Sequence, residues 1–130
     1  MGVRTGRHPE LLRSGEFALA AYQDTDPRVV AYLRLTGEMV SLGREDAKEG
    51  VFPDIDLKPL ESLGVSARHV SRLHCTLLQG PTGTVTLVAG PKTSGTQVNR
   101  TQVEDGTQHP LVVGDRLVLG GHVRLKLVHV

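Results

Sequence analysis

Three separate segments of this chain are rich in groups that bind anions. They are Gly43-Arg44, the run Arg68-His69-Val70-Ser71-Arg72, and the run Lys92-Thr93-Ser94-Gly95-Thr96. Guanidinium groups, hydroxyls and backbone N–H groups exposed beside glycine are the donors that a phosphate dianion requires. Composition alone does not distinguish such a site from ordinary solvated loops. The segments therefore predict a phosphate site only if the fold brings them together.

Other chemistries can be weighed on the same residues. Ser71 and His74 could act as nucleophile and base in a small hydrolase, but the sequence marks no orienting carboxylate or oxyanion hole. His69, His74 and Cys75 suggest a metal site, yet adjacent residues of a strand point to opposite faces. The run 90–96 lacks the Gly-Lys-Ser/Thr order of a P-loop. We therefore expect no enzymatic activity, no metal and no cofactor.

The composition of the chain limits its partners and its surroundings. Its 130 residues fit one domain, and 15 Lys and Arg against 14 Asp and Glu give a net charge of +1. This balance argues against non-specific nucleic-acid binding, and 3% aromatic residues without Trp provide no base-stacking platform. A single cysteine excludes an internal disulfide, and no apolar run approaches the length of a membrane span. We expect a cytoplasmic protein without nucleic-acid or membrane partners.

From Val29 onward the sequence predicts β-structure. Residues 123–129 alternate between apolar and polar side chains, and Gly120-Gly121 before them is a two-residue hairpin signal after the strand 116–119. The other expected strands are Val29–Leu35, Glu38–Leu42, Asp54–Leu57, His74–Gln79, Thr84–Val88 and Gly95–Val98. Many short strands separated by turn residues predict a sandwich or a barrel.

Two stretches lack the strand pattern. Leu57, Leu60 and Leu63 have a spacing of three residues, but Pro59 lies among them, so we expect a long loop there. Residues 1–28 are rich in Arg, Asp and Pro and are expected to form a partly flexible N-terminal arm, in which 17–22 could be a helical turn or a short strand. The expected organisation is an arm over 1–28 and one domain over 29–130.

Four pieces of the sequence, taken in order, resemble the signature of the forkhead-associated (FHA) domain. They are Gly43-Arg44, Ser71-Arg72-Leu73-His74, the run 93–99 and the run 111–120. The resemblance covers residues 29–130. It implies an all-β sandwich of about eleven strands whose loops at one end bind phosphothreonine peptides. The strand pattern, obtained independently, agrees with that fold.

The resemblance also implies roles for the matching residues that would contact a ligand. Arg44 would hold the phosphate by charge-assisted hydrogen bonds, and Ser71 would offer its hydroxyl to the same phosphate. Arg72 would meet the phosphate or the peptide backbone. Thr93 would line the pocket for the threonine methyl group, with Ser94 beside it facing the peptide.

Four further residues would support the site without touching the ligand. Gly43 and Gly95 belong to this set, and Gly95 would permit a backbone turn. His74 would connect the loops by hydrogen bonds, and Asn99 would brace the loop that follows. None of these roles follows from composition or spacing alone. All four are implied by the resemblance.

The sequence departs from the family pattern at three positions. Ser94 stands where the family has an Asn whose amide grips the peptide main chain, and Lys92 stands where Ser is common. Arg100 replaces the Gly that usually follows Asn99, which predicts that the tight Asn-Gly turn is lost. Because Arg44 and Ser71 are unaffected, we expect phosphate binding to survive these changes better than peptide selectivity.

The resemblance implies a binding module that docks onto a phosphothreonine-containing partner, and hence depends indirectly on a Ser/Thr kinase. The alternative is a phospho-independent interaction domain on the same scaffold, which the substituted Ser94 motivates. A further hypothesis concerns Thr25, between Asp24 and Asp26, which could be phosphorylated and occupy the pocket. The competing interpretation of that segment is an exposed acidic turn.

Overall fold

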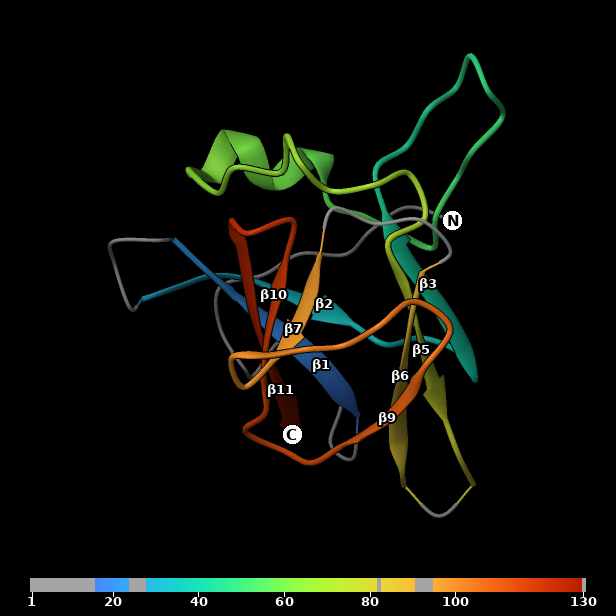
Figure 1. Cartoon of the computed structure of the whole chain (residues 1–130). Helices are drawn as coiled ribbons and strands as arrows, with labels where there is room; N and C mark the ends of the chain where they lie inside the picture. Colours follow the sequence, from blue (N-terminus) through green and yellow to red (C-terminus); the bar gives the residue numbers. More distant parts are fainter. Residues whose placement is uncertain (1–15, 24–27, 82, 91–94, 130) are drawn as a thin grey trace.

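The computed structural model describes residues 16–23, 28–81, 83–90 and 95–129, and in these residues eleven strands form two sheets (Figure 1). The six-stranded sheet consists, in spatial order, of β2 (Val29–Arg34), β1 (Phe17–Tyr22), β11 (Val123–His129), β10 (Arg116–Leu119), β7 (Thr96–Val98) and β8 (Thr101–Gln102). The five-stranded sheet consists of β4 (Ile55–Asp56), β3 (Met39–Gly43), β5 (Cys75–Gln79), β6 (Val85–Ala89) and β9 (Gln108–Leu111). The predicted all-β sandwich of about eleven strands is confirmed.

The core lies between the two sheets and follows from the two-residue period of the strands. In β11 the buried residues Val123, Leu125 and Leu127 alternate with polar or partly exposed ones, and Leu125 is paired with buried Leu117 of β10. The five-stranded sheet contributes residues such as Leu87 from the facing side. Because each sheet buries one face, the pattern fixes the register of the strands.

Phe17–Tyr22, which the sequence analysis placed in the N-terminal arm, forms a strand of the six-stranded sheet. This strand, β1, pairs antiparallel with both β2 and β11. Its four central residues are buried, including Ala18 and Ala20 on the outer face of the sheet. A strand covered on both faces shows no alternation of apolar and polar residues, which explains why the sequence left a helical turn and a short strand both open here. Thr25 and residues 1–15 lie outside the described residues.

The expected long loop around Pro59 is instead a short helix. Lys58–Leu63 forms the 3₁₀ helix η2, with the proline in its first turn, where the missing N–H costs no helical hydrogen bond. The three-residue spacing of the leucines is the period of a 3₁₀ helix. Leu57 and Leu60 are buried in the core, and Leu63 packs against it.

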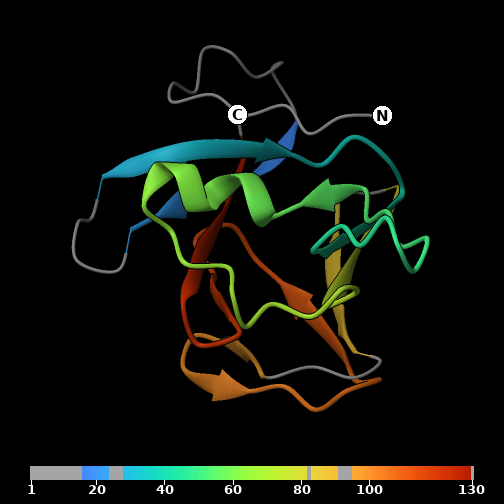
Figure 2. The ribbon, with the colours of Figure 1, turned by 90° about the horizontal axis from the view of Figure 1, so that it is seen from above.

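One end of the sandwich gathers loops from both sheets. Figure 2 looks down on this end, with η2 and the neighbouring loops toward the viewer. Gly43 ends β3, Cys75 begins β5 and Thr96 begins β7, and the turn after β10 lies at the same end. Segments distant in the sequence therefore meet there. In the described part of the chain, no helix is long and apolar enough to span a bilayer.

Candidate functional site

The end of β3 touches the backbone of the loop that carries Ser71. The Arg44 N–H lies 3.2 Å from the carbonyl oxygens of both Ser71 and Arg72. A Cβ atom on Gly43 would lie only 1.9 Å from the Arg72 oxygen, so only glycine permits this approach. The structure therefore places Arg44 and Ser71 beside each other, as the phosphate hypothesis requires.

The side chain of Arg44 is held in place but keeps its charge uncompensated. Its Nη1 donates to the Arg68 carbonyl oxygen at 3.2 Å, and its buried Nε has no hydrogen-bond partner in the part of the chain that the structure describes. Among the described residues no carboxylate forms an ion pair with it. A buried hydrogen-bond donor without a partner is uncommon in folded proteins. An anionic ligand at this position would satisfy both the donor and the charge.

Arg72, which the sequence predicts to meet the ligand, forms an ion pair within the protein. Its Nε lies 2.9 Å from Oδ2 of Asp46, and its side chain is 60% exposed. Asp46 belongs to the loop between β3 and β4, where its backbone pairs with Val51 through two hydrogen bonds of 2.9 Å. Arg72 therefore connects this loop to the loop before β5. Sequence reasoning did not identify Asp46.

His74 is the buried residue that joins the loops. The Ser71 N–H donates to its Nδ1 at 3.0 Å, and its Nε2 lies 2.8 Å from the Gly95 carbonyl oxygen. Because Nδ1 accepts a hydrogen bond, it is unprotonated, so the proton of the neutral ring is on Nε2, which donates to the Gly95 carbonyl oxygen. Its own N–H donates to Leu42, and its carbonyl accepts from Gly90. His74 thus connects β3, the loop before β5 and the start of β7, as expected.

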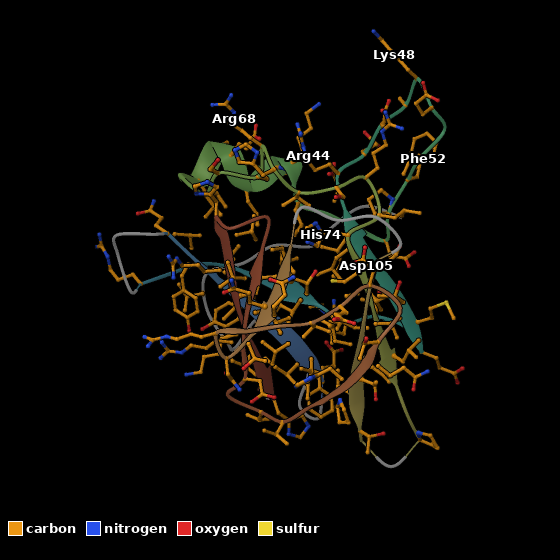
Figure 3. The ribbon with its side chains drawn as sticks, in the orientation of Figure 1. Arg44, Lys48, Phe52, Arg68, His74 and Asp105 are labelled. Atoms are coloured by element: carbon orange, nitrogen blue, oxygen red, sulfur yellow. The ribbon has the colours of Figure 1, made fainter. Side chains whose placement is uncertain are left out.

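These contacts decide two chemical questions about His74. Burial lowers the pKa of His74, with opposing contributions from the Gly95 hydrogen bond and from Asp105, so the ring stays neutral at physiological pH. Both ring nitrogens are already engaged, and neither can take a proton from the Ser71 hydroxyl. The arrangement therefore lacks the base that a hydrolase built on Ser71 would need. Figure 3 shows His74 beneath Arg44 at the loop end of the sandwich.

Gly120, which the sequence marked only as part of a hairpin, also shapes the site. Its N–H donates to the Gly95 carbonyl oxygen at 3.0 Å, so that oxygen receives hydrogen bonds from two segments. A Cβ on Gly120 would lie 2.6 Å from the His69 carbonyl oxygen. The pairing of Leu119 with Val123 makes this a three-residue turn instead of the expected two-residue turn. The β10–β11 turn thus fixes the position of the loop before Ser71.

Comparison with known proteins identifies the family. The sequence matches the family model of the FHA domain over residues 40–120. This chain belongs to the FHA-domain family. A search of curated proteins finds no match to this FHA domain.

Solved structures with the same fold include several FHA domains. The FHA domain of CT664 from Chlamydia trachomatis has a TM-score of 0.65 and 19% identity, with coverage of 88% of this chain and 98% of that chain. The N-terminal FHA domain of Rad53p from S. cerevisiae, solved in complex with a phosphothreonine peptide, has a TM-score of 0.65 and 18% identity over 88% of this chain and 94% of that one. The FhaA FHA domain, complexed with the intracellular domain of Rv3910, has a TM-score of 0.60 and 22% identity over 85% and 98% of the two chains.

Two of the expected ligand residues of this FHA domain, Thr93 and Ser94, lie outside the described residues, as does Lys92. The next described residues are Gly95, with a φ of 124°, and Thr96, which is completely buried. Thr96 Oγ1 has no hydrogen-bond partner among the described residues. Sequence reasoning did not single out this buried hydroxyl beside Gly95.

Asn99 does not lie at the site of this FHA domain, because β7 separates it from Gly95. Its Oδ1 accepts from the Arg116 N–H and its Nδ2 donates to Asp115, each at 2.9 Å, so it braces the β9–β10 turn. The tight turn expected to be lost is retained. Asn99 and Arg100 have φ values of 49° and 70° between the paired residues that end β7 and begin β8, as in a type I′ hairpin. Arg100 adopts the left-handed conformation that glycine usually takes.

The remaining candidate chemistry in the FHA domain concerns metals and the lone thiol. Within the residues that the structure describes, no three His, Cys, Asp or Glu side chains gather in a way that could hold a metal ion. Cys75 is buried, and this raises the pKa of its thiol to about 12. A thiol of this kind is neither a nucleophile nor a metal ligand at neutral pH. Cys75 therefore offers the loop end no nucleophile and no metal ligand at neutral pH.

Proposed function

We propose that this FHA domain is a binding module that recognises phosphothreonine on a partner protein, and that it is not an enzyme. The observation that carries the proposal is Arg44, whose backbone contacts that of Ser71 and whose guanidinium has a buried donor and, among the described residues, no carboxylate partner. The Rad53p domain with the same fold was solved with a phosphothreonine peptide, which supports this ligand class. A Ser/Thr kinase acting on the partner would then control binding.

In this proposal the roles are divided among the loops of the site. Arg44 binds the phosphate, and the Ser71 hydroxyl donates to it. Thr93 receives the threonine methyl group, and Ser94 faces the peptide main chain with one hydroxyl instead of an amide. Arg72 completes the positive surface while it holds Asp46. Gly43, His74 and Gly95 fix the positions of these groups through the close approach and hydrogen bonds described above.

Simple energetics set the expected affinity. Hydrogen bonds to charged groups contribute about 1.5–3 kcal/mol each, and association costs roughly 4–15 kcal/mol. A few such bonds to phosphate are therefore insufficient without contacts to the peptide. We expect a dissociation constant of order micromolar, which corresponds to about −8 kcal/mol.

The proposal is tested by measuring peptide binding by calorimetry with phosphothreonine, phosphoserine and unphosphorylated forms of one sequence. Wild type should bind the phosphothreonine form at micromolar concentration and the unphosphorylated form negligibly. Arg44→Ala should weaken binding by more than about tenfold, since it removes more than one charge-assisted hydrogen bond. Arg100→Ala is the matched control, because it removes the same charge at the other end of β7. If Arg44→Ala binds within twofold of wild type, the role of Arg44 is wrong.

The second candidate function is phospho-independent protein interaction on the same scaffold. The replacement of the family's Asn by Ser94 and the ion pair that engages Arg72 favour it. Titration with a candidate partner protein, before and after phosphatase treatment, separates the two functions. Equal binding of the two forms would support this alternative, and loss of binding after the treatment would support phosphothreonine recognition.

A further inference from the structure

The outer face of the six-stranded sheet carries two cations that stand directly opposite each other. Arg116 of β10 and Lys126 of β11 are partners in the antiparallel register of the two strands. They alternate with Leu117 and Leu125, which are buried in the core, so both cationic side chains project from the other face of the sheet. Side chains at opposed positions of antiparallel strands have Cβ atoms roughly 4.5–5.5 Å apart. The two positive charges are therefore neighbours on one surface.

This pair of like charges is not compensated within the part of the chain that the structure describes. Arg116 is exposed and Lys126 is partly exposed, and neither side chain forms an ion pair or a hydrogen bond with a described residue. The nearest carboxylate in the sequence, Asp115, braces the preceding turn, where its two oxygens accept from Asn99 Nδ2 and from the Val112 N–H, each at 2.9 Å. Like charges directly opposite each other destabilise a sheet. An arrangement that costs stability without a structural gain is expected where function requires it.

Beside these cations, a turn exposes two apolar side chains. Val112 and Val113 lie between β9 and β10 and are 67% and 56% exposed. Their turn is fixed against β11, because the N–H of the next residue, Gly114, donates to the Leu127 carbonyl oxygen at 2.8 Å. Leu127 directly follows Lys126, so the turn lies next to the two cations. Single exposed apolar residues are ordinary on protein surfaces, and the two valines gain significance from the unpaired charges beside them.

These residues form a surface that is separate from the candidate phosphate site. We call it the β10–β11 patch, and it consists of Val112, Val113, Arg116 and Lys126. Arg116 is the first residue of β10, whereas Gly120, which contacts the loop before β5, directly follows its last residue. Figure 1 shows the end of β11, marked C, at the opposite end of the molecule from η2. A ligand at one site therefore leaves the other accessible.

We propose that the β10–β11 patch is a second docking surface, which binds a protein segment that carries Asp or Glu side chains next to apolar ones. Carboxylates pair with the two cations, and the apolar side chains of the partner are buried against the valines. The two cations of the patch, in a chain of net charge +1, are too few for nucleic acid or an anionic membrane, which are bound through many positive charges. This inference goes beyond phosphothreonine recognition and does not depend on it.

The test uses the isotopically labelled full chain and NMR titration, which detects weak binding and reports its place. The probes are a panel of short synthetic peptides in which the order of Glu and Leu is varied. At least one of them should shift the amide signals of residues 112–116 and 126–128 and leave those of 68–74 in place. The matched peptide with Lys for Glu should cause no such shift. The peptide with Ser for Leu should bind about threefold more weakly or less still, because the apolar contact is lost.

One variant separates binding from folding. Arg116→Glu places a carboxylate opposite Lys126, a favourable cross-strand pair, so the urea midpoint should stay unchanged or rise. The affinity for the best Glu-Leu peptide should nevertheless fall about five- to tenfold, since an attractive charge contact becomes a repulsive one. Lys48→Glu, in the loop between β3 and β4, is the control with the same charge change and should keep the affinity. Figure 3 shows Lys48 at the loop end of the molecule, away from the patch.

The possible outcomes distinguish this inference from the proposed function. If no peptide of the panel shifts the signals of the patch, or Arg116→Glu keeps the affinity, the inference is overturned. Binding of a DNA oligonucleotide or of phosphatidylserine vesicles at the patch without peptide binding overturns it as well. Phosphothreonine peptides should bind Arg116→Glu within about twofold of wild type, because the two sites are distant and independent. Failure of phosphothreonine binding in wild type would refute only the proposed function.

Discussion

At the scale of the residue, the site depends on a close contact that only glycine permits. The Cβ of an alanine at position 43 would overlap the Arg72 carbonyl oxygen and lie 3.0 Å from that of Ser71. Both neighbours are backbone atoms and cannot rotate away. Gly43→Ala must therefore push the loop before β5 away from Arg44, and we expect a loss of roughly 1–3 kcal/mol in the free energy of unfolding, as for other overpacked sites.

This prediction is checked by urea denaturation together with peptide titration. Gly37→Ala is the matched control, since its nearest contact would be 3.8 Å from a Cβ and its φ is not positive. The control should change the free energy of unfolding little and leave binding intact. Equal stability of Gly43→Ala and Gly37→Ala would show that the contact is not required.

Some residue contacts could be predicted from the sequence and others could not. The proximity of Arg44 to Ser71 and the connecting role of His74 follow from a motif whose order reflects the fold. The ion pair between Arg72 and Asp46 depends on the path of the loop between β3 and β4, which no local pattern encodes. Arg100 keeps a positive φ because the register of β7 and β8 demands a two-residue turn, whatever residue occupies it.

At the scale of the elements, the alternating pattern predicts strands where one face is buried and the other solvated. It predicts 116–119 and 123–129 with the bounds that the structure gives. It leaves β1, which is buried on both faces, open between a helical turn and a short strand, and it misses β8 and β9. β8 has only two residues, both exposed, and β9 contains a proline. The strand pattern is therefore informative in proportion to the difference between the two faces of a strand.

The loops between these elements are joined by His74, and this makes their stability depend on pH. The pKa of His74 is lowered in the folded protein, chiefly by burial, whereas the unfolded chain has a pKa of about 6.5. Above that pH both states are neutral and His74 contributes no pH dependence. As the pH falls through about 6.5, the unfolded state binds a proton that the folded state resists, so stability falls by up to about 1.4 kcal/mol per pH unit until the folded pKa is reached.

This pH dependence is measured by urea denaturation of wild type and His74→Gln from pH 8 to pH 5. The variant should be less stable at pH 8, because the bonds to Ser71 and Gly95 are impaired, but its stability should fall less steeply with acid. His122→Gln, which removes an exposed histidine, controls for the other imidazoles. Parallel pH profiles for wild type and His74→Gln would contradict the assignment.

At the scale of the whole molecule, the site belongs to neither sheet alone. Gly43 and His74 lie at ends of strands in the five-stranded sheet, whereas Gly95 and Gly120 flank strands of the six-stranded sheet. The hydrogen bond from His74 to Gly95 crosses between the two. Binding at the loop end therefore requires that the sheets pack in their native positions, so a change far from the site that disturbs this packing should also weaken binding.

The position of β1 provides the sharpest test of this dependence. β1 lies between β2 and β11, so a chain that begins at residue 29 leaves β2 without the strand that joins it to the six-stranded sheet. We expect that chain to lose cooperative unfolding and phosphopeptide binding together. A chain that begins at residue 16 keeps β1 and should retain both.

A milder change tests the same point without removing a strand. Leu19 of β1 is fully buried, and Leu19→Ala should cost about 2–5 kcal/mol, a large part of the 5–15 kcal/mol that stabilises a typical domain. If residues 17–22 were part of a loosely attached arm, the same substitution would leave the urea midpoint almost unchanged, and the chain from residue 29 would unfold like the full one. The two shortened chains and Leu19→Ala, measured side by side by urea denaturation and peptide titration, therefore decide whether the binding domain begins at β1 or at residue 29.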